Sequence, residues 1–544
     1  MARRDRPPRT TQDRVLKISH YKIPLAQIFA PLLEMEKEKE KQRSTLNLTT
    51  LNEDVLLEIL EELSPLDAFN LSLTSRLLYP IARCRALSAI ELRTQQQLVS
   101  FCDFMIDDID SRLYWLRRLC VRLRHHALPE SLLSPPMQRL ASLLERATGL
   151  RHLEIDCLDL AIDIEPYVGH TLEALSGLVS LKLLDVSQHS LGVLSRLQAR
   201  VQRLSVHMAF GADGDSLLPT ISRFTACESL SLERVSIESI SSSAFPAVRE
   251  LSLCGCYVPL STLRAFSHLR VLRLEQHIRC PDPLVSSAPC WSHLDYLEAH
   301  TDFARHWRLG CPISHVSLAS VIGSPARVLR ARRVPSTPES VVLLRLVKDS
   351  RPIVLDFRIM VGEQLCDDFW QKMIRYMPKL RSLEIELCSF EGQDNLLTHV
   401  LWLDAMAEQL RSLRSLMYIG VCINSSIVRH NHEGTKVPMP KDCETARSLA
   451  AKLAAVMPSL KCVLFGFGSR AQDAGRYAHL FRGDFSWWKV LRVRGMSGSL
   501  VPLSPQRGEK VRALLRSPPY EEPVSINDDQ LEKVNLARCS VLYP

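Results

Sequence analysis

The hydrophobic positions of residues 51–82, LNEDVLLEILEELSPLDAFNLSLTSRLLYPIA, recur at helical spacing and predict three short helices. Ser64 is expected to cap the second helix, with Pro65 in its first turn. Thr74 or Ser75 is expected to begin the third. Three helices of this size bury little core of their own, so their surplus leucines are expected to contact a second polypeptide. The apolar positions are Leu51, Val55, Leu56, Leu57, Ile59, Leu60, Leu63, Leu66, Phe69, Leu71, Leu73, Leu77, Leu78, Ile81 and Ala82.

A different pattern begins after residue 86. The stretches LRSLEIELCSF (380–390), VRELSLCGCYV (248–258) and LKLLDVSQHSL (181–191) place apolar residues at positions 1, 4, 6 and 11, and a cysteine or histidine at position 9. The alternation within each copy is typical of a strand, and the fixed offset to the later Cys or His requires a turn of constant shape. This is the pattern of leucine-rich repeats. The candidate strands centre on Ile90, Leu119, Leu153, Leu184, Leu204, Leu230, Leu251, Leu272, Leu297, Leu329, Leu355, Leu383, Leu416, Val463 and Leu491.

Helices are predicted between some of these strands. Residues 443–457 and 366–377 carry apolar side chains at helical spacing, and each segment is followed by a proline and then by a strand. A helix-and-strand unit of this size cannot bury its own apolar face, so neighbouring units must stack. The predicted fold class is α/β, a curved leucine-rich-repeat solenoid with strands on the concave side, preceded by a small three-helix domain.

Composition excludes several classes of protein. Apolar residues make up 46% of the 544 residues, enough for a sizeable core, and the net charge of +8 is too mild for a nucleic-acid binder. Sixteen cysteines without a CxxC pair fit reduced thiols in the cytosol or nucleus. The basic start leads into no run of signal-peptide length, and the longest apolar stretch, ESVVLLRLV, is too short to span a bilayer. We expect neither nucleic acid nor membrane as a partner.

Residues 51–82 resemble an F-box. The family's leading Leu-Pro, its helix ending in leucine before a Ser-Pro turn, and its closing "LSLVSRRFYRLA"-like segment are similar to LNEDVLLEILEELSP and LSLTSRLLYPIA. Asn52 stands where the family has proline, which removes one rigid adaptor contact. The resemblance implies docking on a Skp-type adaptor and, through it, on a cullin. The positions implied at that interface or in its immediate support are Leu51, Leu56, Ile59, Leu60, Leu63, Pro65, Leu66, Leu71, Leu73, Leu78 and Tyr79.

An F-box followed by irregular leucine-rich repeats resembles the fungal type of substrate receptor in cullin-based ubiquitin ligases. The resemblance implies a non-catalytic subunit, cytoplasmic or nuclear, that holds target proteins for ubiquitination, with neither a cofactor nor catalytic residues. The expected division is a polar, basic arm over 1–46, the F-box over 47–85, the solenoid over 86–497, and a cap with a partly disordered tail over 498–544.

Strand periodicity predicts which side chains line the concave face. Its charge changes sign along the array, and Met417, Ile419 and Leu464 make it apolar near the end. These three suit a partner's anchor residue, the protein's own folded-back tail, or a wrong register in weak repeats. The candidate target-binding residues are Arg273, Glu275, Arg330, Arg332, Glu384, Glu386, Met417, Ile419, Leu464, Arg492 and Arg494.

Other chemistry is not supported by the sequence. The histidine pairs 125–126, 300 with 306, and 430 with 432 lack partners at metal-ligand spacing, so no metal site is predicted. Nucleotide-binding loops and the nucleophile motif GxSxG are absent. Three alternatives stay open: an F-box scaffold that works without a cullin, a leucine-rich binding module whose first helices are only a cap, and a repeat protein that activates GTPases.

Overall fold

The protein is described here by a computed structural model, and its chain divides after Ala86 into two compact units. No helix among the described residues is long and apolar enough to cross a membrane. The described residues are 51–107, 112–123, 134–156, 158–210, 217–236, 245–258, 260–275, 291–306, 310–323, 338–361, 368–388, 396–424, 443–470, 481–492 and 498–516.

The first unit contains helices α2 (Glu53–Glu62) and α3 (Pro65–Ser72) and all but the last two residues of α4 (Tyr79–Ser88). Ser64 caps α3 as expected, since its hydroxyl accepts a hydrogen bond from the Asp67 amide at 3.1 Å. The last helix begins at Tyr79 rather than at Thr74 or Ser75. Pro80 explains the difference, because proline fits the first turn of a helix but clashes with the preceding turn deeper inside one.

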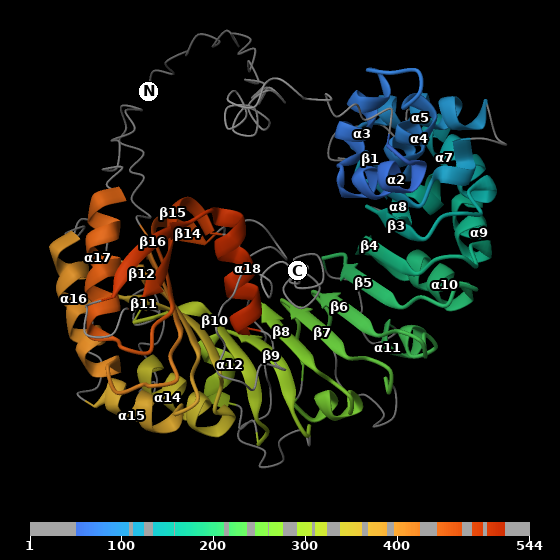
Figure 1. Ribbon diagram of the computed structural model, residues 1–544. Coiled ribbons are helices and arrows are strands. Elements are labelled where there is room, and N and C mark those ends of the chain that lie inside the picture. The colour runs from blue at the N-terminus through green and yellow to red at the C-terminus, as the bar shows by residue number, and fades with distance from the viewer. Residues whose placement is uncertain are drawn as a thin grey trace, which may run out of the picture. The chain divides into compact units, whose positions relative to one another are not determined.

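The described residues of the second unit form one sheet of sixteen strands, whose spatial order is their order in the chain. Neighbouring strands are parallel up to the fourteenth, and the last two run antiparallel. This long, open sheet fits a solenoid-like arrangement, and Figure 1 shows its curvature. The strands are β1 (Ala89–Leu92), β2 (Arg118–Val121), β3 (His152–Ile155), β4 (Ser180–Val186), β5 (Arg203–Met208), β6 (Ser229–Glu233), β7 (Glu250–Cys254), β8 (Val271–Glu275), β9 (Leu294–Ala299), β10 (Ile313–Ile322), β11 (Val354–Met360), β12 (Ser382–Cys388), β13 (Tyr418–Asn424), β14 (Cys462–Arg470), β15 (Phe481–Leu491) and β16 (Ser499–Leu503).

Helices cover the convex side of this sheet, whereas α18 (Pro505–Arg516) lies on its inner side (Figure 1). The helices expected over 443–457 and 366–377 correspond to α17 (Cys443–Val456) and α15 (Phe369–Tyr376). The other elements are α5 (Gln95–Ile106), η3 (Leu113–Trp115), α7 (Ser134–Arg146), α8 (Leu158–Ile164), α9 (Tyr167–Ala174), α10 (Gln188–Arg196), α11 (Leu217–Ile221), η5 (Leu260–Ala265), α12 (Thr301–His306), α14 (Glu339–Ser350), α15 (Phe369–Tyr376), α16 (Leu396–Leu410) and α17 (Cys443–Val456).

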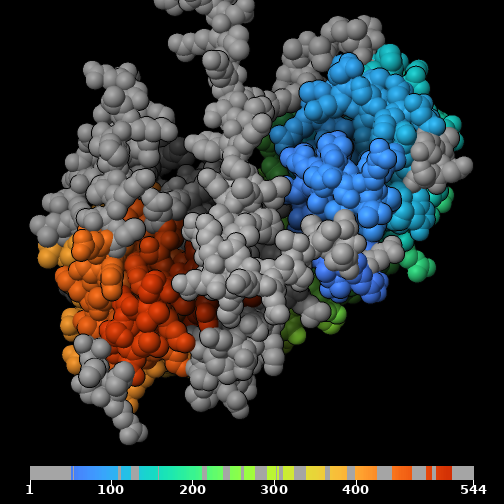
Figure 2. Space-filling view, turned by 45° about the horizontal axis from the view of Figure 1, so that its top comes forward, coloured from blue at the N-terminus to red at the C-terminus, as the bar shows by residue number. Residues whose placement is uncertain are grey.

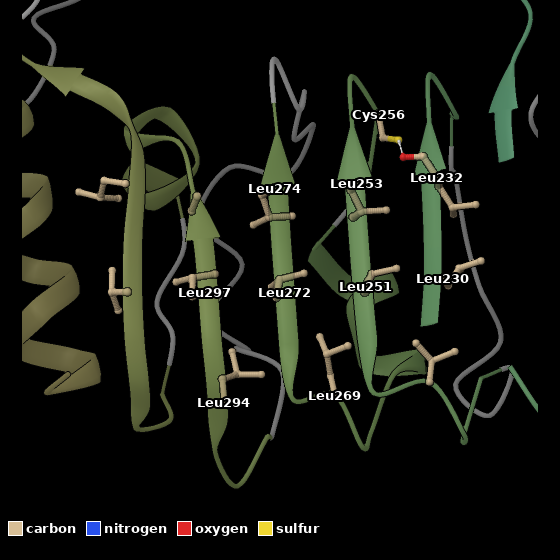
Figure 3. Packing of buried hydrophobic residues seen from close by; sticks show 14 of the residues in the cluster. Leu230, Leu232, Leu251, Leu253, Cys256, Leu269, Leu272, Leu274, Leu294 and Leu297 are labelled. Carbon is tan, nitrogen blue, oxygen red and sulfur yellow. Dashed lines mark hydrogen bonds between the residues drawn. The ribbon is translucent and has the colours of Figure 1, made fainter. Parts of the chain in front are cut away.

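The main core lies between the sheet and the convex helices. Alternate strand residues point into it, so that Leu230, Leu251 and Leu272 pair in register on successive strands and stack as a ladder (Figure 3). Cys256 occupies the turn after such a strand, where its thiol donates to the carbonyl of Leu232 at 3.3 Å. Burial raises the pKa of this thiol to about 11, which keeps the donor protonated. The position 9 cysteine therefore ties one turn to the preceding strand.

Three strand markers were wrong in register. On β15, Trp488 rather than Leu491 pairs with the ladder residue Val463. Leu181, not Leu184, pairs with Leu153 and Leu204 in the core ladder. On β13 the ladder residue is Ile419 rather than Leu416, which lies in the turn before the strand. Leu413, Leu416 and Ile419 are spaced three residues apart, so the three-residue step between the first two apolar positions of a repeat fits either pair. The alternation of a strand begins at Ile419 and continues to Val421, which fixes the register.

The array also differs at two places from the predicted one. Strand β10 was not predicted; its Val316 pairs with Leu297 and Leu355 in the same ladder, whereas the marker Leu329 lies outside the described residues. At the C-terminal end, residues 498–516 of the expected cap and tail form β16 and α18. The rest of that segment, like the N-terminal arm, lies outside the described residues.

Candidate functional site: an apolar face and a covered concave surface

Residues 55–79 expose more large apolar side chains than a surface helix pair requires. Leu66, Leu73 and Leu77 are 68%, 67% and 71% exposed. Such a cluster marks a surface that another molecule covers. Figure 2 shows the side chains of this segment, coloured blue, at the molecular surface. The exposed set is Val55, Leu57, Leu66, Phe69, Leu73, Leu77 and Tyr79.

This apolar face rests on a small, specific core. Leu56, Leu60 and Leu78 are buried, together with the small residues Ala68 and Ala82, which let the helices approach closely. The leucines that face outward are therefore those left over once this core is filled.

Arg85 fastens α4 to the end of α2. Its guanidinium donates to the carbonyl of Leu60 at 3.2 Å, to that of Glu61 at 2.9 Å and to that of Leu63 at 3.1 Å. These carbonyls lie at the C-terminal end of a helix, where intrahelical donors run out and a cation is favourable. One side chain thus fixes the relative position of two helices that carry the apolar face.

The concave surface of the second unit holds a buried cluster of charges beneath α18. Arg512 donates to Glu384 through Nε to Oε1 at 2.6 Å and through Nη2 to Oε2 at 2.8 Å. Arg516 lies 2.7 Å from both Glu384 Oε2 and Asp356 Oδ1. The Tyr418 hydroxyl donates to Glu384 at 2.9 Å. Glu384 and Asp356 are 0% exposed, so these contacts replace water.

His315 completes this cluster from the neighbouring strand β10, with Nε2 at 2.8 Å from Asp356. Burial lowers the pKa of His315 and outweighs the effect of the Asp356 carboxylate, which favours the charged ring. For Glu384, burial alone would raise the pKa, but Arg512 and Arg516 offset it and the pKa is lowered. The cluster therefore places the carboxyl groups of Glu384 and Asp356 between two arginines and an imidazole whose pKa is lowered.

Comparison with known families identifies the first of these two sites. Residues 48–85 match the family model of the F-box domain. The chain carries an F-box domain. F-box domains in general bind Skp-type adaptors within cullin complexes and serve in substrate recognition. A search of curated proteins finds no match to the chain.

The F-box residues inferred from the resemblance divide by burial. Leu66, Leu73 and Tyr79 are exposed, and the supporting positions Leu56, Leu60 and Leu78 are buried. The half-buried members are Leu51, Ile59, Leu63, Pro65 and Leu71.

Four exposed residues of this face, Val55, Leu57, Phe69 and Leu77, were missing from that set. A position beside a buried residue of the same helix is the signal for one of them. Leu57, for example, is next to the buried Leu56 and cannot share its face.

Most of the described residues in the expected target-binding set are covered by the chain's own side chains, and target binding at them stays a prediction. Glu384, Glu386 and Arg273 are buried, and Leu464 lies in an apolar cluster with Val511 and Leu515 of α18.

The other expected target-binding residues also differ from the prediction. Ile419 faces the opposite side, in the main core, because the register was wrong. Met417 is partly buried, and Glu275 is half-buried at the end of β8. Arg492 is exposed but donates to the carbonyls of Ala454 and Met457, both at 2.6 Å, at the end of α17. The residues of this set outside the described part of the chain are Arg330, Arg332 and Arg494.

The described part of the chain contains no group of three His, Cys, Asp or Glu side chains able to hold a metal ion. Ten cysteines of the described part form no disulfide. The histidines at 125, 126, 430 and 432 lie outside the described residues.

Proposed function

We propose that the protein is the non-catalytic substrate-recognition subunit of a Skp–cullin–F-box ubiquitin ligase, of the fungal type with irregular leucine-rich repeats. The exposed apolar face of residues 55–79, within the segment that matches the F-box model, carries the proposal. Burying a leucine side chain stabilises a complex by roughly 1.5–3 kcal/mol, so a partner covering several of them gains a strong anchor.

The repeating strand and helix units supply the target-binding part in this proposal. The ladder of leucines and the turn cysteine agree with the repeat pattern in the sequence. Such a receptor performs no bond chemistry; it raises the effective concentration of its target near a ubiquitin-charged enzyme. The proposed division is an F-box over 47–85, repeats over 86–497 and a C-terminal segment over 498–544, and the proposed location is the cytoplasm, the nucleus or both.

Co-purification and calorimetry with a purified Skp-type adaptor test the proposal. We expect the wild-type chain to bind, and the double variant Leu66→Asp with Leu73→Asp to lose binding by at least a hundredfold. Both side chains are exposed, so the variant keeps its fold. The matched control is Leu401→Asp, since Leu401 is 61% exposed on α16 of the other unit. Wild-type protein that does not bind the adaptor would favour the alternative, a repeat scaffold acting without a cullin.

A further inference from the structure

Helix α18 presents a two-part pattern to the sheet. Arg512 and Arg516 are four residues apart, as are Val511 and Leu515, so both pairs follow one side of the helix. All four residues are buried. Two buried arginines and two buried aliphatic side chains therefore hold α18 on the sheet.

The sheet provides a complementary row under this helix. Asp356, Glu384, Gly420 and Leu464 pair in register across β11 to β14, so acids stand at one end and an apolar residue at the other. Gly420 keeps the middle open: a Cβ there would lie 2.9 Å from Glu384 Cγ and 2.8 Å from the Tyr418 hydroxyl oxygen. The glycine therefore lets tyrosine and glutamate meet.

At the apolar end of the row, the backbone of α18 packs closely against the Trp487 ring. Trp487 stacks on Tyr418 with ring centroids 6.0 Å apart. A Cβ on Gly508 would lie 2.1 Å from Trp487 Cδ2, so the helix can rest on this ring only with glycine at that position. Charge, apolar contact and backbone approach thus select one kind of helix.

The bonds that hold α18 are also ones that a second helix can replace. A buried ion pair adds little net stability over an apolar pair, but it gives specificity, because a helix lacking either arginine leaves a carboxylate unpaired. Ser504 alone separates α18 from β16, so the helix holds its site at high local concentration. A competing helix has to match the same pattern to displace it.

We propose that the concave surface of β11 to β14 is a binding site for an amphipathic helix with two arginines one turn apart, each preceded by an aliphatic residue. Helix α18 occupies this site within the chain, and a helix of the same pattern in another protein takes its place. Naming that second helix as the ligase target rests on the proposed function; the binding site itself does not.

A synthetic peptide of residues 504–516, SPQRGEKVRALLR, is the probe. Fluorescence anisotropy measures its binding to the full chain and to the full-length variant Arg512→Glu with Arg516→Glu, whose own helix is repelled by Glu384 and Asp356. We expect the variant to bind the peptide at least tenfold more tightly than wild-type protein. Adding Glu384→Gln and Asp356→Asn to the variant abolishes the gain, and so does a Gly508→Val peptide.

Equal, weak binding to variant and wild type overturns the proposal, provided that circular dichroism shows a cooperative unfolding transition for the variant above the assay temperature. Amide hydrogen exchange of wild-type protein gives a second test. We expect the amides of residues 507–516 to exchange through a local opening that leaves β12 protected. If α18 and β12 exchange only in one common opening, the proposal is also overturned. Adaptor binding is measured in parallel, so a chain that binds the peptide but no adaptor refutes the ligase function and keeps the site.

Discussion

Arg512 donates two parallel hydrogen bonds to Glu384, although 128 residues separate the two in the chain. The pair joins α18 to strand β12. It covers part of the concave surface that the sequence predicted to be exposed for target binding. Fully buried pairs of this kind are sensitive to loss of either member, because the remaining charge is left without water.

Replacing Glu384 by Gln is expected to cost about 3–5 kcal/mol, since two arginines then lose a buried carboxylate. Chemical denaturation measures the loss. The control is Asp404→Asn, which removes an exposed ion pair with Lys452 at 3.4 Å and is expected to cost no more than about 1 kcal/mol. Similar small costs for both variants would contradict the buried pairing.

Docking of α18 is expected to weaken in acid. The pKa of Glu384 is lowered below its ordinary value of 4.5, so its contribution is complete above that pH and is lost as the pH falls through the folded-state pKa. His315, whose pKa is also lowered, acts in the same direction, because it must become charged beside Arg516. The other acids that contact the arginines of the cluster are Asp356 and Glu509, and Glu386 on the same strand pairs with Arg358.

Tryptophan fluorescence reports this transition, since Trp487 lies against Gly508 of α18. We expect a change below pH 4.5 that precedes global unfolding, and a Trp487→Phe variant supplies the control for the other tryptophans. A signal that stays flat until the whole chain unfolds would refute selective release.

Replacing Asn52 by Pro is expected to strengthen adaptor binding severalfold and to leave stability nearly unchanged. The backbone of Asn52 has φ −58° and ψ 146°, which proline adopts without strain. The Asn52 side chain accepts a hydrogen bond from the Asp54 amide at a long 3.4 Å, so its loss costs little capping energy. Proline also lowers the conformational entropy of the unfolded chain, which offsets this cost. Calorimetry with the adaptor checks this, and weaker binding than wild type would show that the amide is preferred.

Replacing Arg85 by Ala is expected to destabilise the F-box by about 1–3 kcal/mol, because three carbonyls at the end of α2 lose their donor. Adaptor affinity should fall although Arg85 is not part of the apolar face. Thermal unfolding together with adaptor titration tests this. The comparison is Arg93→Ala, which removes an exposed ion pair with Glu91 at 3.0 Å; equal effects of the two substitutions would argue against the cap.

Local patterns in the sequence were enough for much of the fold. Ser64 followed by Pro65 marks a helix start, and the alternation of Leu251 and Leu253 marks a strand, because both signals act within a few residues. The pattern failed where two registers were equally good, as at Leu416 and Ile419, and where tertiary packing rather than leucine spacing defines a strand, as in β10.

The sequence by itself determined that a helical segment with surplus leucines precedes a chain of stacked strand-and-helix units, since periodicity depends only on neighbouring residues. Only the tertiary structure decided which leucines of that segment stay open, and that Glu384 and Leu464 lie under α18. The physical reason is range: burial depends on what the rest of the chain places against a residue, and no local period links Arg512 to Glu384.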